Sequence, residues 1–319
     1  MSVAKNVQPP LVSVIVPVRN GREDILRLLA ALAAQTVPRN RFELVIGDDG
    51  STDGSTLGLD VGDGLVRVVE GPPRNSYAAR NRAVRGSRAP ILAFCDADCI
   101  PEPEWIECGI AALEHSDVVA GRVRFDVPQR RTVWTLLDMD ASKDHEREVR
   151  NGTAETANLF LRRALFDRIG GFEEEIPEFG DFDFVQRCVA RGASLSFGPD
   201  VVVWHPTRNR AKPFLRAQWI YSRGYAAREG REGRLPQGLR LRALVPVVQP
   251  LLARRGWGRS VGPDRKWLGE HGVKPTVAET AKALTIMYLL LPYLRAAAQF
   301  VGWAEGRRLR VARQGAESA

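Results

Sequence analysis

Cysteine is scarce in this chain, and its spacing argues against its usual special roles. Cys95, Cys99, Cys108 and Cys188 are the four cysteines among 319 residues, and no two of them form a C-x-x-C pair. Redox motifs and zinc sites normally carry such pairs. Cys95 lies inside an apolar run, so we expect these residues to serve as small apolar side chains with reduced thiols, as in a cytosolic enzyme.

Long apolar segments are also missing. The first residues lack the basic stretch, apolar core and cleavage site of a secretory signal, so we expect a cytoplasmic protein. The most apolar run, residues 284–294, contains Pro292 and is about half as long as the roughly 20 residues that span a bilayer. A transmembrane helix is therefore not expected. An amphipathic segment in the interface of a membrane is favoured over core helices packed on the rest of the protein.

The excess of basic over acidic residues lies at one end of the chain. Residues 1–206 hold 24 basic against 31 acidic residues, whereas residues 207–319 hold 22 against 7. We therefore divide the chain into a domain at 1–206 and a basic, helical region at 207–319. Such a region can attract phosphates, nucleic acid or anionic lipid. The aromatic interleaving or reading module of a nucleic-acid binder is not found, so peripheral membrane contact at the inner face of the plasma membrane is favoured.

The chain is organised around the sequence PILAFCDADC at residues 90–99. Residues 91–95 are a continuous apolar run, typical of a strand buried on both faces, and Asp96 and Asp98 follow it directly. In open α/β sheets the ligand crevice lies outside the carboxyl ends of the strands. Carboxylates suit Mg²⁺ and Mn²⁺, which commonly bridge protein carboxylates and substrate phosphates. The run therefore predicts a metal and diphosphate site rather than an acidic surface turn.

Strands and helices alternate before this run. Apolar runs predict strands at 11–18, 42–47 and 65–69, helical spacing follows at 25–32, and Ser76 is expected to cap a helix at 77–84. This alternation predicts an α/β fold with a mainly parallel, Rossmann-like sheet flanked by helices. Later elements are expected at 103–115, 118–125, 157–161, 162–169 and around Phe182, Leu195 and Val201. Residues 129–150, highly charged and with few apolar anchors, are expected to form a mobile, partly helical segment over the site.

Seven short motifs occur in order along the first two thirds of the chain, and together they resemble family 2 glycosyltransferases. They are PVRN (17–20), DDGSTD (48–53), AARNRA (78–83), DAD (96–98), GGF (170–172), GDFDF (180–184) and WH (204–205). The resemblance covers about residues 11–205. It implies the GT-A fold and an inverting enzyme that moves a sugar from a nucleoside-diphosphate sugar, with UDP favoured, to a hydroxyl of a glycan, lipid-linked or small-molecule acceptor.

The resemblance also implies donor-binding residues. Pro17 and Asn20 would edge the nucleotide, and Asp48 or Asp49 would accept from a base N–H or the ribose. For Asp53 a turn stabilised by its own hydrogen bonds is favoured. Arg80 would bind phosphate or pair with an acidic neighbour, and these alternatives stay open.

The chemical roles fall on the later motifs. The resemblance assigns Asp96 to the nucleotide, Asp98 to Mn²⁺ or Mg²⁺, and His205 to the metal or the diphosphate. It implies that Asp181 is the general base. Gly180 stands where the family usually has Glu, which leaves Glu178 and Asp183 as rivals for that role.

Other interpretations remain at this stage. A nucleotidyltransferase also places a nucleotide and metal at strand ends, but its Gly-rich signature is poorly matched after the first strand. A catalytically inactive, membrane-associated scaffold is argued against by the intact acids and His205. Downstream, Arg216, Gln218, Trp219 and Arg223 resemble loosely the acceptor-side segment of processive relatives. Cell-envelope or glycan biosynthesis is the expected setting.

Overall fold

The protein was analysed as a computed structural model that describes residues 9–59, 66–141, 144–176, 178–236, 239 and 265–317. The chain forms two compact units. The first comprises Met1–Arg124 and Lys143–Pro206, and the second comprises Phe125–Ser142 and Thr207–Ala319. The second unit thus contains residues 207–319, as in the division made from the sequence. It also contains Phe125–Ser142, which that division assigned to the first domain.

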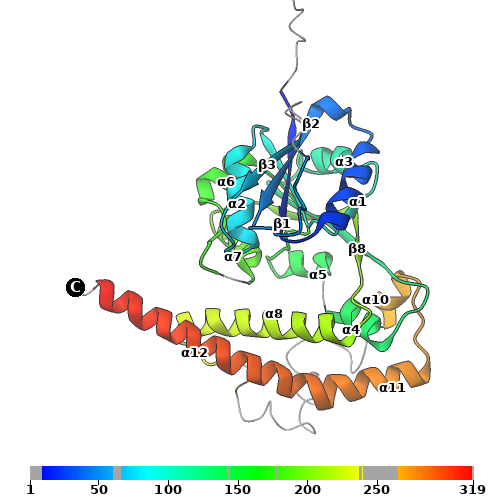
Figure 1. The fold of residues 1–319 in the computed structure, drawn as a ribbon, viewed down its shortest axis with the longest axis vertical. Helices are drawn as coiled ribbons and strands as arrows, with labels where there is room; N and C mark the ends of the chain where they lie inside the picture. The colour runs from blue at the N-terminus through cyan, green and yellow to red at the C-terminus, as the bar shows by residue number, and fades with distance from the viewer. Residues whose placement is uncertain are drawn as a thin grey trace, which may run out of the picture. The chain divides into compact units, whose positions relative to one another are not determined.

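The first unit is built on a mixed eight-stranded sheet with the order β3-β2-β1-β4-β7-β6-β8-β5 (Figure 1). The first four strands in this order are parallel, as predicted, while β7 is antiparallel to β4 and β6, and β5 is antiparallel to β8. Along the chain, α1 (Arg22–Ala33) lies between β1 and β2, and α2 (Ser76–Gly86) lies between β3 and β4. The strands are β1 (Val12–Val18), β2 (Phe42–Asp48), β3 (Val66–Glu70), β4 (Ile91–Cys95), β5 (Ile100–Pro101), β6 (Val118–Asp126), β7 (Asn158–Arg162) and β8 (Leu195–Pro206).

Helices cover both faces of this sheet. On one face, a buried core includes Ile25 and Leu28 of α1 (Arg22–Ala33) and Trp105 of α3 (Trp105–Ala112). The short helix η1 (Arg39–Arg41) directly precedes β2 in the chain. On the other, a second core gathers apolar side chains from α2 (Ser76–Gly86), α6 (Arg163–Ile169) and α7 (Gly180–Ala190). Two-sided burial explains why the central strands read as continuous apolar runs.

Two local expectations were wrong. Asn75, not Ser76, caps α2, because its side chain accepts the N–H groups of Tyr77 and Ala78. The segment at 129–150 is not loosely anchored: it forms α4 (Val133–Ala141) and α5 (His145–Arg150), and Leu136, Leu137 and Met139 of α4 are buried. These apolar residues were not recognised as anchors in the sequence, because the segment around them is rich in charged residues.

The second unit is helical, as predicted. Its elements are α4, α8 (Ala211–Arg231), α10 (Arg265–Glu270), α11 (Val277–Thr285), the π-helical turn η4 (Ile286–Leu290) and α12 (Leu291–Glu317). Apart from Leu239, residues 237–264 lie outside the described part of this unit. Thr276 and Glu279 form a capping box that starts α11.

Helices α8 and α12 lie side by side and touch backbone to backbone (Figure 1). A Cβ on Gly302 would lie 2.0 Å from the carbonyl oxygen of Arg223, and one on Gly306 would lie 2.1 Å from that of Ala227. Only glycine allows this approach.

The helical segment Val277–Val311 contains an 18-residue window with a mean hydropathy of 1.4 and is long and apolar enough to cross a membrane by length and composition alone. A transmembrane helix had not been expected, because the uninterrupted apolar run at 284–294 is too short to span a bilayer.

Candidate active site

Three potential metal ligands converge where β4 and β8 end. Asp96 and Asp98 follow β4, and His205 is the penultimate residue of β8. A ligand atom of each side chain lies within 4.8 Å of the others, and His205 Nε2 is 3.5 Å from Asp98 Oδ2. Antiparallel pairing of β5 with β8 brings Ile100 opposite Trp204, which explains how residues so distant in sequence meet. Two carboxylates and an imidazole form a donor set that fits Mn²⁺ and also accommodates Mg²⁺.

Arg80 connects α2 to this cluster. Its Nη2 donates to Asp96 Oδ1 at 2.6 Å, and the Arg80 side chain is only 5% exposed. The guanidinium carbon also lies 5.5 Å from the centre of the Tyr77 ring. Two roles were expected for Arg80, phosphate binding or pairing with an acidic neighbour. In the structure Arg80 pairs with Asp96.

The first two motifs form interlocking loops at the ends of β1 and β2. Parallel pairing sets half-buried Pro17 opposite Gly47. Asn20, in the left-handed region at φ 56°, accepts the N–H of Thr52 at 2.8 Å, and its own N–H donates to Ser51 Oγ at 3.0 Å. These contacts fix the loop that would edge a nucleotide.

Asp48 and Asp49 are both buried but have different partners. Asp48 accepts from the N–H of Ser51 at 2.8 Å and from Thr56 Oγ1 at 2.9 Å, so both of its oxygens hold the loop. Asp49 Oδ1 accepts the N–H of Arg74 at 2.9 Å and contacts Arg82 Nη2 at 3.3 Å. Asp53 accepts from the hydroxyl of Ser55 and, at 2.9 Å, from its N–H; the hydroxyl first and the N–H second lower the pKa of this exposed carboxyl, which agrees with the expected turn.

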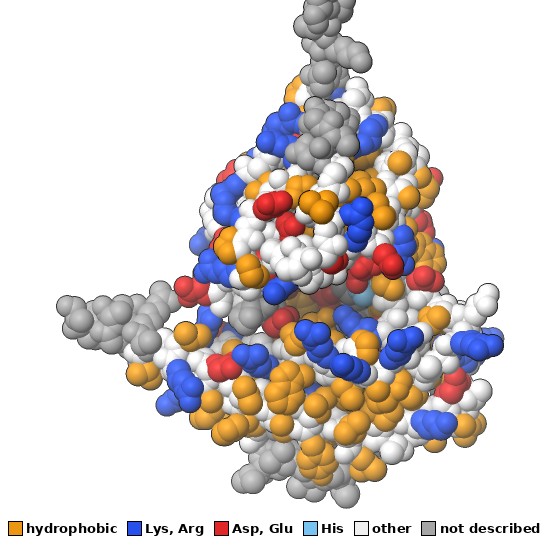
Figure 2. Space-filling view, in the orientation of Figure 1, with side chains coloured by type: hydrophobic (Ala, Val, Ile, Leu, Met, Phe, Trp, Pro, Cys, Tyr) orange, Lys and Arg blue, Asp and Glu red, His pale blue; other side chains and the backbone are white. Residues whose placement is uncertain are grey.

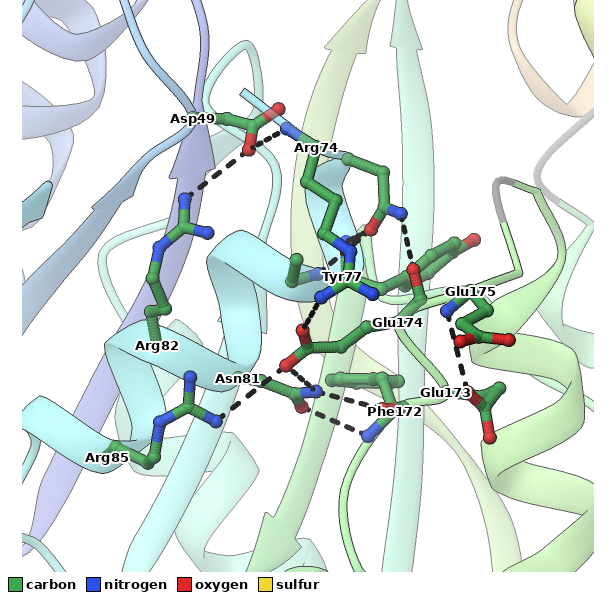
Figure 3. A network of polar contacts seen from close by, with 12 residues as sticks. Asp49, Arg74, Tyr77, Asn81, Arg82, Arg85, Phe172, Glu173, Glu174 and Glu175 are labelled. Carbon is green, nitrogen blue, oxygen red and sulfur yellow. Dashed lines mark hydrogen bonds and ion pairs between the residues drawn. The ribbon is translucent and has the colours of Figure 1, made fainter. Parts of the chain in front are cut away.

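A polar network joins the loop before α2 to the GGF segment (Figure 3). Glu174 is its centre: its carboxylate contacts Arg74 Nη1 at 2.8 Å and Asn81 Nδ2 at 3.0 Å, while its carbonyl accepts from Asn75 at 2.8 Å. Asn81 also exchanges two hydrogen bonds with the backbone of Phe172, at 2.8 and 3.0 Å. Sequence reasoning missed Glu174, although Asn81 lies inside a motif it had singled out.

Asp181 lies in the first turn of α7 and is held by four donors. Oδ1 accepts from the Tyr77 hydroxyl at 3.1 Å and the Phe182 N–H at 3.0 Å. Oδ2 accepts from the Thr156 N–H at 3.2 Å and the Thr156 hydroxyl at 3.4 Å. Burial, followed by the charge of Glu155, raises the pKa of Asp181. Tyr77 and Thr156 were not anticipated, because no motif marked Thr156 and Tyr77 directly precedes AARNRA.

The two rivals of Asp181 differ from it. Asp183 pairs with Arg187 at 2.8 Å, and Arg187 in turn binds the carbonyl of Gly171 at 2.7 Å, so this acid stabilises the helix and the GGF turn. Asp183 lies inside the helix, since the N-cap position belongs to Phe179. Burial, with the charge of Asp181 second, raises the pKa of Glu178 to about 7.

Comparison with known proteins decides the family. The model for glycosyl transferase family 2 matches residues 13–171. The glycosyltransferase AglE of Haloferax volcanii is 34% identical over 225 residues, which cover 67% of this chain and 73% of AglE. The chain belongs to glycosyl transferase family 2. This glycosyltransferase is thus an enzyme by family, and the nucleotidyltransferase alternative is not favoured.

More distant proteins support the fold. The succinoglycan biosynthesis protein ExoU of Rhizobium meliloti is 29% identical over 204 residues, covering 58% of each chain. The mannosyltransferase PcManGT of Pyrobaculum calidifontis, solved with GDP-Man and Mn²⁺, superposes with a TM-score of 0.58 at 19% identity, covering 94% of this glycosyltransferase and 87% of that chain. The predicted GT-A fold is confirmed.

Proposed function

We propose that this glycosyltransferase transfers a sugar, with inversion, from a nucleoside-diphosphate sugar to a hydroxyl of a glycan or lipid-linked acceptor. The observation that carries the proposal is the convergence of Asp96, Asp98 and His205 at the ends of β4 and β8, beside the interlocked loops of β1 and β2. A UDP-sugar is the favoured donor. PcManGT, solved with GDP-Man, and the structural neighbour TarS of S. aureus, solved with UDP-GlcNAc, lend support to a donor of this class.

The nucleotide would lie against the first two loops. Among the described residues, the hydrogen bonds that Asp49 accepts from Arg74 and Arg82 both go to Oδ1, which leaves Oδ2 to accept from a base N–H or a ribose hydroxyl. Pro17 and Asn20 would edge the base, and Asp48 would keep the loop in shape. Asp96, fixed by Arg80, would face the ribose or the metal.

Asp98 and His205, with Asp96, would hold Mn²⁺ or Mg²⁺. The bound ion would stabilise the negative charge that gathers on the leaving diphosphate. Arg80 adds a fixed positive charge on the same side, because it is buried and hydrogen-bonded to Asp96.

Asp181 would act as the general base. The acceptor hydroxyl gives its proton to Asp181 while its oxygen forms a bond to the anomeric carbon. The bond between that carbon and the diphosphate oxygen breaks, and its electron pair leaves with the diphosphate. One displacement of this kind inverts the anomeric centre. The raised pKa of Asp181 suits the role, since a more basic carboxylate accepts a proton more readily.

Donor binding tests this function directly. Melting temperatures would be measured with UDP-glucose, UDP-N-acetylglucosamine and GDP-mannose, each with and without Mn²⁺, because a ligand bound only by the folded protein raises its melting temperature. We expect metal-dependent stabilisation by one nucleotide class in the wild type and none in Asp98→Ala. Asp200→Ala, which removes an exposed acid of β8, is the matched control. No response to any nucleotide, confirmed by calorimetry, would contradict the proposal.

We further propose that the second unit contacts a membrane surface. Exposed apolar side chains follow one another at helical spacing on η4 and α12, and hydrophobic side chains gather over this region in Figure 2; they are Leu289, Leu290, Tyr293, Phe300 and Val301. Exposed Lys282 and Arg308 lie near the two ends of this stripe. Apolar side chains bordered by cations fit an anionic lipid surface.

Polar contacts on the opposite side of α12 favour a helix that lies in the interface over one that spans. Arg295 donates to Gln218 at 2.6 and 3.0 Å, and Arg223 pairs with Glu305 at 2.8 Å. Crossing the bilayer would bring these groups of the α8–α12 pair into hydrocarbon, where charged side chains are costly. We thus place the enzyme peripherally, at the inner face of the plasma membrane, where a polyprenyl-linked or other envelope glycan would serve as acceptor.

Vesicle sedimentation tests the membrane contact. We expect binding to vesicles that contain phosphatidylglycerol, weaker binding to phosphatidylcholine alone, and release at high salt. Phe300→Ser with Val301→Ser should abolish binding, whereas Leu26→Ser, which changes an exposed leucine of α1, should not. Equal sedimentation of all variants would contradict the contact, and resistance to alkaline carbonate extraction from membranes would instead favour a spanning helix.

A further inference from the structure

The tyrosine that begins α2 touches the candidate base on α7. Tyr77 is 5% exposed and Asp181 is 9% exposed, and the Tyr77 hydroxyl donates to Asp181 Oδ1 at 3.1 Å. Burial, with the charge of Asp181 second, raises the pKa of Tyr77 well above its ordinary value. The phenol therefore stays protonated and can only donate to the carboxylate.

The same ring fills the space beside Gly180, the one position where this chain departs from the family motif. A Cβ on Gly180 would lie 2.9 Å from ring carbons Cδ2 and Cε2 of Tyr77. The ring is packed against Phe172, with centroids 5.7 Å apart, so it cannot move aside freely. A glutamate at 180 and a tyrosine at 77 thus compete for one space, and in this chain the tyrosine occupies it.

The other hydrogen bonds of the Asp181 carboxylate indicate what the Tyr77 hydroxyl does for it. Oδ1 has two donors at 3.0 and 3.1 Å, whereas the weakest contact of the group is the Thr156 hydroxyl on Oδ2 at 3.4 Å. That hydroxyl can rotate away without disturbing the backbone. The arrangement anchors Oδ1 and leaves Oδ2 as the oxygen that can exchange a donor for an incoming hydroxyl.

We propose that Tyr77 is the positioning residue for Asp181: its ring replaces the side chain missing at Gly180, and its hydroxyl fixes Oδ1 so that Oδ2 receives the acceptor's proton. This inference rests on the proposed role of Asp181 as the base. Helix α2 would then position two groups of the site, because Arg80, one turn after Tyr77, lies over the same ring and donates to Asp96. One helix then aligns the base with the leaving-group side of the site.

The first experiment removes only the hydroxyl. Tyr77→Phe would be compared with the wild type in hydrolysis of whichever tested nucleotide-sugar raises the melting temperature most with Mn²⁺, with water as acceptor. We expect kcat to fall about 10-fold with KM unchanged, since Oδ1 loses one of its two hydrogen-bond donors. The acidic limb of the kcat profile should move to higher pH, because the ionised carboxylate loses a donor. Tyr288→Phe, in the second unit, is the control for loss of a phenol.

The second experiment needs no activity. Gly180→Ala should lower the melting temperature in the wild type, because its Cβ meets the ring, but not in Tyr77→Ala, where the space is open. Tyr77→Ala with Gly180→Glu, which restores the residue usual in the family, should be more stable than Gly180→Glu alone. Additive effects of the two substitutions would overturn the shared-space argument.

The outcomes separate this inference from the proposed function. If Asp181→Asn abolishes hydrolysis while Tyr77→Phe keeps the wild-type rate and pH profile, the positioning role is overturned and the base assignment stands. If Asp181→Asn hydrolyses the donor at the wild-type rate, the base assignment fails and the positioning role fails with it. A fall of kcat in both variants, with the shifted acidic limb in Tyr77→Phe, supports the inference.

Discussion

His205 Nε2 lies 3.5 Å from Asp98 Oδ2, although the two residues come from different parts of the sheet. Asp98 comes just after the parallel strand β4, and His205 is the penultimate residue of β8, which reaches the site by pairing with the short strand β5. The side chain of His205 is 5% exposed, whereas that of Asp98 is 37% exposed. The buried imidazole therefore fixes one side of the cluster, while Asp98 stays accessible to an ion and its substrate.

His205→Ala should weaken metal binding without unfolding the protein. Loss of one ligand is expected to raise the Mn²⁺ concentration that gives half of the donor-induced stabilisation by at least about 10-fold, as for other groups that hold a metal site. Titration of Mn²⁺ at a fixed nucleotide-sugar concentration measures this. His115→Ala, which removes an exposed histidine after α3, should leave the titration unchanged. An unaltered titration in His205→Ala would remove His205 from the site.

Asp181→Asn should lower kcat by about 10²–10⁴-fold, the usual contribution of a positioned general base. Asparagine keeps the size of the side chain, so donor affinity measured by calorimetry should not change. Asp183→Asn is the matched comparison, because Asp183 lies on the same helix but is paired with Arg187. We expect Asp183→Asn to lower the melting temperature and to change kcat much less than Asp181→Asn does. A larger loss of kcat in Asp183→Asn than in Asp181→Asn would reverse the assignment.

Glu178 should make the protein less stable as the pH rises. Burial raises its pKa in the folded state from 4.5 to about 7, so between these values the folded protein holds a proton that the unfolded chain releases. Stability from this group is thus lost as pH rises through 7. Glu178→Gln removes the effect, so its melting temperature relative to wild type should rise between pH 5 and 8, by about 2–4 °C if about 1 kcal/mol is recovered. A difference that does not vary with pH would contradict the shifted carboxyl.

The parallel half of the fold could be predicted because its signals are local. Strands buried on both faces give continuous apolar runs, and acids at their carboxyl ends, such as Asp48 and Asp96, mark the crevice. The antiparallel half gave no such signal, since the pairing of β7 with β4 depends on contacts distant in sequence. The anchors in α4 were missed because they lie in a segment rich in charged residues, with Asp138 and Asp140 on either side of Met139.

Within the site, the sequence could supply residue types but not their partners. The motifs named Asp96, Asp98 and His205 as candidates, and in the structure a ligand atom of each lies within 4.8 Å of the others. Nothing in the sequence linked Tyr77 to Asp181, or Asp49 to Arg82, because these hydrogen bonds join different elements. Gly180 was visible only as a departure from a pattern, and its explanation required the ring beside it.

Glu174→Gln should loosen the segment that leads to α7. The carboxylate contacts Arg74 and Asn81, so loss of its charge is expected to cost about 1 kcal/mol, or a fall of about 2–4 °C in melting temperature. Glu173→Gln changes the exposed neighbour in the same loop and should be close to neutral. Hydrogen exchange should localise the effect to residues 171–176. A melting temperature left unchanged by Glu174→Gln would mean that the contacts of this carboxylate with Arg74 and Asn81, shown in Figure 3, add no stability.

Gly302→Ala should destabilise the helix pair of the second unit while leaving donor binding intact. The new Cβ would lie 2.0 Å from the backbone carbonyl oxygen of Arg223, so α8 and α12 must move apart, at a cost of about 1–3 kcal/mol for overpacking. Gly269→Ala is the matched control, because a Cβ there meets no atom within 4 Å and alanine favours the helix. Hydrogen exchange should therefore accelerate in α8 and α12 for Gly302→Ala and slow or stay constant for Gly269→Ala. Unchanged exchange in Gly302→Ala would mean that the two helices do not touch at this glycine in solution.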